Sequence, residues 1–151
     1  MQVQTATIRE ATENDLEAII ALFADDPLGG HGDTTDPQAL PDYLAAFRMI
    51  ATSPNETLYV AELGGEVVGT FQTMVTTTMT ARGASSLIVE AVQTRADMRG
   101  RGIGAVMINF AIDKARADAI ADLAALRATD ADIARIQNAL EVLCGCVGYP
   151  A

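Results

Sequence analysis

A glycine-rich loop between an apolar strand and an amphipathic helix constrains the fold of this chain more than any other feature. The strand is predicted over Ser86–Val92, and the helix begins within the run Gly-Arg-Gly-Ile-Gly at residues 100–104. Glycines let the backbone approach a ligand closely, and the first N–H groups of a helix have no partner inside it. With arginines at positions 95, 99 and 101, the loop predicts a binding site for a phosphate-bearing ligand at the helix N-terminus.

The same run carries a family resemblance. Arg99-Gly100-Arg101-Gly102-Ile103-Gly104 matches the pattern Q/R-x-x-G-x-G/A, and on this motif the chain resembles the GNAT family of N-acetyltransferases. The segment Thr7–Leu16 is similar to the first strand and helix start of that family, and Tyr59–Thr70 is similar to its central hairpin. The resemblance implies an α/β fold, with a mixed, mostly antiparallel sheet flanked by helices and an acyl-CoA splay beside the fourth strand.

The resemblance also implies an activity and a set of binding residues. Acetyl-CoA would be the co-substrate, and a small-molecule amine would be acetylated on nitrogen by direct transfer. In the family, the fourth strand pairs with the pantetheine arm and the glycine motif holds the pyrophosphate, while Arg95 could reach the 3′-phosphate. The cofactor-binding residues implied here are therefore Val92, Thr94, Arg99, Gly100, Arg101, Gly102, Ile103 and Gly104.

Two residues are candidates for catalysis. Glu90 interrupts an apolar strand and is expected on the face opposite Val89 and Ala91. If that face lines the substrate cleft, burial would raise the pKa of Glu90 toward a range useful for a general base, a role that an acid on this strand often has in the family. A solvent-facing carboxylate is the alternative. Cys144 stands where the family usually has its proton-donating tyrosine, and water is the alternative donor.

Other functions remain open for the glycine motif. Gly100 to Ala105 also fits G-x-G-x-x-A, the fingerprint of dinucleotide-binding oxidoreductases. Against that interpretation, a loop follows Val92 where the fingerprint would begin at the strand end, and the motif lies late in the chain. The glycines could also serve turn geometry alone. A third hypothesis keeps the fold but makes the chain a CoA-binding module with little or no turnover.

The composition of the chain restricts the kinds of molecule that it is expected to bind. The chain has 151 residues, enough for the single domain predicted over residues 1–151, and its net charge of −10 comes from 20 acidic and 10 basic residues. Such a surface repels nucleic acid and anionic membranes but suits an amine substrate. The chain has no signal-like N-terminus, so a cytoplasmic location is predicted. A metal site is not expected from Cys144, Cys146 and His31, and relatives suggest a homodimer.

The pattern of apolar residues and turn signals predicts the order of elements. Helices are expected from Thr12, from Asp36 and over Gly102–Ala117, and strands over Gln4–Arg9, Thr57–Leu63, Glu66–Thr78 and up to about Gln93. The C-terminal third, about residues 119–151, is atypical. The family implies a fifth strand near Ala121–Thr129, yet those residues favour helix over strand.

Overall fold

The computed structural model describes residues 5–26 and 32–125, with side chains described up to residue 118. Its contacts separate into two compact units, residues 1–108 and residues 109–151, so the prediction of one domain stays a prediction. The elements run in the order β1 (Thr7–Glu10), α1 (Leu16–Ala24), α2 (Leu40–Thr52), β2 (Glu56–Leu63), β3 (Glu66–Thr77), β4 (Ser85–Thr94) and α3 (Ile103–Ala125).

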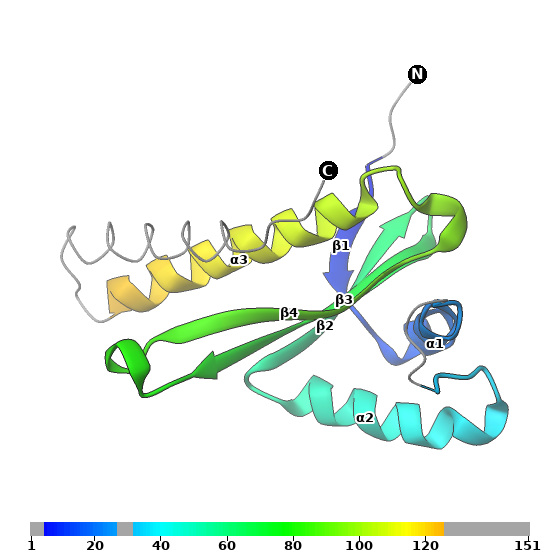
Figure 1. Ribbon diagram of the computed structural model, residues 1–151, viewed down its shortest axis with the longest axis horizontal. Coiled ribbons are helices and arrows are strands. Elements are labelled where there is room, and N and C mark those ends of the chain that lie inside the picture. The colour runs from blue at the N-terminus through cyan, green and yellow to red at the C-terminus, as the bar shows by residue number, and fades with distance from the viewer. Residues whose placement is uncertain (1–4, 27–31, 126–151) are drawn as a thin grey trace. The chain divides into compact units, whose positions relative to one another are not determined.

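The described strands form one antiparallel sheet in the order β1-β2-β3-β4 (Figure 1). The predicted hairpin at Gly64-Gly65 joins β2 to β3, and both glycines have positive φ, as a tight turn requires. The α/β fold with flanking helices is therefore confirmed. β3 and β4 pair along nearly their whole length, which fixes the position of β4, where the predicted site residues begin.

Helices α1 and α2 cover one face of the sheet (Figure 1). Because apolar residues recur at helical spacing, α1 places Leu16, Ile19 and Ile20 in a buried cluster with Phe47 of α2 and the strand residues Leu58 and Val60. Two apolar residues of α2 lie outside this cluster and in solvent, since Leu40 is 45% exposed and Met49 is 74% exposed.

The opposite face of the sheet receives the first two turns of α3. A Cβ built on Gly69 of β3 would lie 3.1 Å from the Met107 sulfur and 3.0 Å from the Gln93 carbonyl oxygen, so glycine is required there for close packing. Met107 is fully buried, and Tyr59 and Phe71 stack with their ring centroids 5.0 Å apart. This packing fixes where α3 begins relative to the sheet.

An ion-pair cluster joins β1 to β2 and to the turn that precedes α1. The Arg9 guanidinium donates to both carboxylate oxygens of Asp15 at 2.8 Å and to Glu62 at 2.8 Å. Asp15 also accepts from the Thr12 N–H at 2.8 Å. The hydrogen bonds from Arg9 lower the pKa of Asp15 to about 2, although burial of this carboxyl acts in the opposite direction.

Helix α3 differs from the prediction. It continues through Ala125, so residues 121–125, where the family resemblance implied a fifth strand, are helical. The physical reason is local, since alanine and leucine in this stretch favour helix. Among the described residues, no helix is long and apolar enough to cross a membrane.

Candidate functional site

The glycine loop, residues 99–104, leads from a short turn at Ala96–Met98 into α3. Gly100 and Gly102 have φ values of 73° and 81°, a region that residues with a Cβ rarely adopt. The Val106 N–H donates to the Gly102 carbonyl at 3.1 Å. The N–H groups of the first turn therefore point beyond the start of the helix, as an anion site requires.

The glycines of this loop border open space. A Cβ built on Gly100, Gly102 or Gly104 meets no atom within 4 Å. Positive φ alone explains the glycines at 100 and 102, but Gly104 has no positive φ and lies in the first turn of α3, where glycine costs about 1 kcal/mol relative to alanine. Turn geometry therefore explains Gly100 and Gly102 but not Gly104, and a ligand held by the loop stays a prediction.

The three arginines beside the loop differ in their contacts. Arg95 is held by Glu66 at 2.9 Å and Asp97 at 2.7 Å, and these pairs raise its pKa. The Arg99 Nε donates to the Thr94 carbonyl at 3.1 Å. Arg101 makes no hydrogen bond or ion pair with any part of the chain that the structure describes. The guanidinium expected near a 3′-phosphate, that of Arg95, is thus already neutralised, and Arg99 and Arg101 remain as the exposed cations.

A β-bulge lies in β4 directly before the predicted cofactor residues. Gln72 pairs with Glu90 and Thr70 pairs with Gln93, so Phe71 of β3 faces two residues of β4. These two are Ala91, whose φ is 51°, and Val92, which is 36% exposed. The extra residue shifts the alternation of side chains along β4.

The bulge was not predicted from the sequence, although a signal was present. Glu90 and Gln93 are polar residues in an apolar strand, and their odd spacing cannot place both on one face of a regular strand. In the structure they share a face, because their partners Gln72 and Thr70 are two residues apart. Gln93 uses this position to donate to Asp26 Oδ2, just beyond the end of α1, at 3.0 Å.

The structure brings the predicted cofactor-binding residues together. Val92, Thr94 and the glycine loop form a continuous backbone path from the bulge to the start of α3. Glu90 lies on β4 beside this path and is exposed, which agrees with the alternative of a solvent-facing carboxylate, and its role as a base stays a prediction. Cys144, Cys146 and His31 lie outside the described residues.

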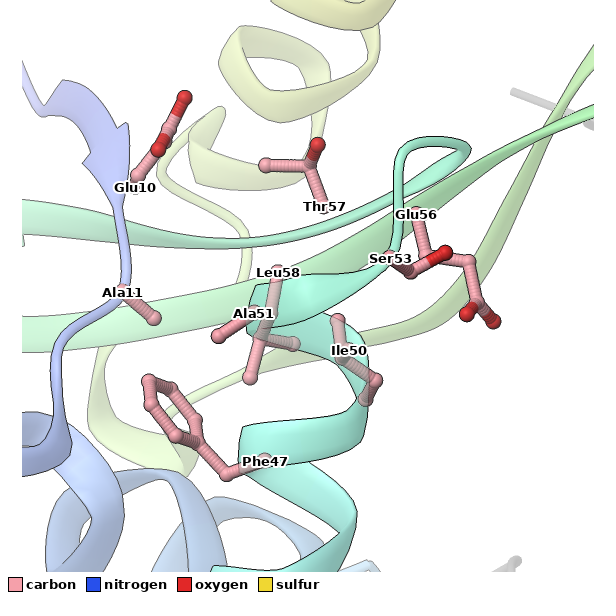
Figure 2. A pocket seen from close by; sticks show the side chains of 9 residues that line it. All are labelled: Glu10, Ala11, Phe47, Ile50, Ala51, Ser53, Glu56, Thr57 and Leu58. Atoms are coloured by element: carbon pink, nitrogen blue, oxygen red, sulfur yellow. The ribbon is translucent and has the colours of Figure 1, made fainter.

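A separate hollow of about 210 Å³ lies where α2 leads into β2 (Figure 2). Its floor is apolar and includes Phe47, Ile50 and Leu58, while Glu10 and Glu56 stand at its rim and point in different directions. Among the described residues, neither Glu90 nor any of the predicted cofactor-binding residues lines it. It is therefore distinct from the glycine loop.

Comparison with known proteins agrees with the geometry. The model of the acetyltransferase (GNAT) family matches residues 16–138. A transcriptional regulator from Bacillus halodurans C-125 is similar, with 37% identity, a TM-score of 0.71 and 75% of each chain covered. A putative acetyltransferase from Agrobacterium tumefaciens str. C58 shares 26% identity and a TM-score of 0.58 over 72% of each chain.

A more distant structure shows the same fold. Glucosamine-6-phosphate N-acetyltransferase from Arabidopsis thaliana is 19% identical, with a TM-score of 0.59 over 73% of this chain and 74% of that one. No curated protein sequence matches the chain.

Proposed function

The chain belongs to the GNAT acetyltransferase family, whose members use acetyl-CoA, and on that premise we propose that it acetylates a small amine on nitrogen by direct transfer. The observation that carries the proposal is the glycine loop. Its three glycines border open space. Its backbone N–H groups lie at the start of α3, which is the positive end of the helix dipole. This arrangement fits a pyrophosphate held by the backbone.

The proposal assigns roles to the predicted binding residues. The N–H groups of Gly102, Ile103 and Gly104 would hold the pyrophosphate, while the exposed side chains of Arg99 and Arg101 add positive charge. The backbone of Val92 and Thr94 would pair with the pantetheine arm. Ile103 is only 5% exposed, so it anchors the loop at the start of α3.

Chemically, bound acetyl-CoA supplies an activated thioester carbonyl close to β4. Glu90, directly or through water, accepts the proton that the amine loses as its nitrogen forms the new C–N bond. The C–S bond breaks, and the departing thiolate takes a proton from Cys144 or from water. Holding both reactants together accounts for much of the expected rate gain.

The acceptor is proposed as a small amine on grounds of charge. The chain carries 20 acidic residues against 10 basic ones, and Glu90 and Asp26 lie on the α1 side of β4. These carboxylates favour a cationic substrate. A homodimer is also proposed from the family resemblance, and sedimentation would test it. The cytoplasmic location expected from the sequence stays a proposal.

Release of CoA thiol from acetyl-CoA, measured with a panel of primary amines that includes glucosamine 6-phosphate, tests the activity. Calorimetry with CoA and with NAD tests the binding site. We expect amine-dependent thiol release and binding of CoA but not of NAD. Binding of NAD alone would instead support the dinucleotide-dependent oxidoreductase.

A second candidate is a CoA-binding module with little turnover. Two observations favour it, the exposure of Glu90 and the helix over residues 121–125 in place of the family's strand. Tight CoA binding without thiol release for any amine of the panel would support this candidate over the acetyltransferase.

A further inference from the structure

Gln93 lies between the two residues assigned to the pantetheine arm, Val92 and Thr94, but its side chain points to the α1 side of the sheet. Without the bulge, the side chain of residue 93 would lie on the opposite face, because successive strand residues alternate. The extra residue at Ala91–Val92 therefore brings the Gln93 amide within reach of Asp26. The resulting hydrogen bond is 3.0 Å long and half-buried.

Asp26 lies just beyond the C-terminal end of α1. It directly follows the C-cap of α1, Asp25, and its N–H donates to the Phe23 carbonyl at 3.3 Å. The C-terminal end of a helix carries partial negative charge and disfavours carboxylates, and the last turn of α1 contains no basic residue. The hydrogen bond from Gln93 links this carboxylate to β4.

The other end of the contact is rigid. Gln93 pairs with Thr70, which is fully buried and donates to the Tyr59 carbonyl at 2.8 Å. Two residues farther along, the Arg95 N–H donates to the Val68 carbonyl at 2.8 Å. The end of β4 is thus fixed by backbone hydrogen bonds to β3 and, on the face covered by α1, by the hydrogen bond from Gln93 to Asp26.

From this geometry we propose that the Gln93–Asp26 hydrogen bond is a positioning contact that holds the end of β4 against the end of α1, so that Val92 and Thr94 keep the arrangement that binds the pantetheine arm of CoA. The inference rests on the proposed CoA site. It makes Gln93 and Asp26 positioning residues, since their side chains act through the β4 backbone.

The experiment uses the full chain with two measurements, the Kd for CoA by calorimetry and the hydrogen-exchange rates of the Arg95 and Asp26 amides without ligand. Gln93→Ala, the isosteric Gln93→Met and Asp26→Leu remove the contact. We expect each to raise the Kd and both exchange rates by about 10- to 150-fold, the range for loss of a hydrogen bond to a charged group. Asp26→Asn keeps an acceptor oxygen and should restore values close to wild type.

Glu13→Gln is the matched control. Glu13 accepts from Arg48 at 2.9 Å, which joins the turn before α1 to α2 at a distance from β4, so this variant should leave the Kd and both exchange rates unchanged. Wild-type values in Gln93→Ala and Gln93→Met would overturn the proposal, as would an Asp26→Asn variant as impaired as Asp26→Leu.

The two measurements also separate this inference from the proposed function. If the wild-type chain binds no CoA, the proposed function fails and the role in CoA binding falls with it. If the wild-type chain binds CoA and the variants bind it equally well while exchange rises, the proposed function stands and the positioning role is overturned.

Discussion

Glu90 and Gln93 lie on the same face of β4, although three positions separate them along the strand. Their partners on β3, Gln72 and Thr70, are two positions apart, and the bulge at Ala91–Val92 absorbs the difference. The bulge thus places the Gln93 side chain on the same side of the sheet as the candidate base, Glu90, and the end of α1. It also turns the strand at the point where the predicted pantetheine contacts begin.

The bulge is strained, and the strain can be tested at Ala91. Its φ of 51° is a conformation that glycine adopts freely and alanine does not. Ala91→Gly should therefore stabilise the fold by about 0.5–1 kcal/mol, net of the extra entropy of glycine in the unfolded chain. Denaturant unfolding measures the change. Ala84→Gly, at an exposed position without positive φ, should destabilise instead, and equal effects of the two variants would contradict the assignment of strain.

A side chain at Gly102 should block the cofactor. Gly102→Val fills the open space in front of the loop, so CoA binding should fall below detection in calorimetry. The matched control is Gly83→Val, because Gly83 has a φ of 84° and also borders open space but lies in the turn between β3 and β4. Both variants share the backbone strain, so similar losses of stability are expected. Undiminished CoA affinity in Gly102→Val would refute the proposal that the glycine loop holds the pyrophosphate.

Arg101 should contribute more to CoA binding than Arg95. Arg101→Ala removes an exposed cation and should weaken binding by about 1–3 kcal/mol if it forms a charge-assisted bond with phosphate. Arg95→Ala removes a side chain that Glu66 and Asp97 already neutralise, so its effect on the Kd should be smaller. Titrations with CoA and dephospho-CoA would also reveal whether either arginine contacts the 3′-phosphate. A larger loss of affinity in Arg95→Ala would reverse this ranking.

Glu90→Gln tests the proposed base. It should keep the affinity for CoA but lower the acetylation rate by about ten- to ten-thousand-fold at neutral pH, with a smaller loss at high pH where the free amine forms without help. Glu10→Gln, which changes an exposed glutamate at the end of β1, should leave the rate unchanged. A Glu90→Gln rate equal to wild type at every pH would leave deprotonation to water.

The Arg9–Asp15 pair should make stability depend on pH in the acid range. Hydrogen bonds from Arg9 lower the pKa of Asp15 from 3.8 to about 2, so the folded chain binds this proton less readily than the unfolded chain. The stabilisation, about 2 kcal/mol, is fully present above pH 4 and is lost as the pH falls toward 2. The free energies of unfolding of the wild type and Asp15→Asn should converge as the pH falls through this range. A difference that stays constant with pH would exclude a contribution of Asp15 to the pH dependence of stability.

Local signals in the sequence predicted much of the fold. Gly64-Gly65 specified the hairpin, and Asp36 caps the turn that leads into α2, accepting from the Gln38 N–H at 2.9 Å. The glycine loop specified the start of α3. In each case a few neighbouring residues determine the conformation, so no knowledge of distant contacts was needed.

Features that depend on distant contacts were missed or wrongly predicted. The bulge follows from how β4 packs against β3, and the Asp26–Gln93 contact joins residues far apart in the chain. The helix over residues 121–125, by contrast, agrees with the local preference of these residues and not with the strand that the resemblance implied. The exposure of Glu90 could not be read from the pattern of its neighbours, because the bulge changes that pattern.

The place of β4 in the sheet has a consequence for handling the protein. Within the described part of the chain, β3 alone pairs with β4, and a strand edge with unpaired N–H and C=O groups is a template for pairing with further chains. Glu90 is the one charge in the strand, and a charge at such an edge discourages aggregation. Its neutralisation should therefore lower solubility as well as activity, and CoA bound along the edge should protect the protein during concentration and storage.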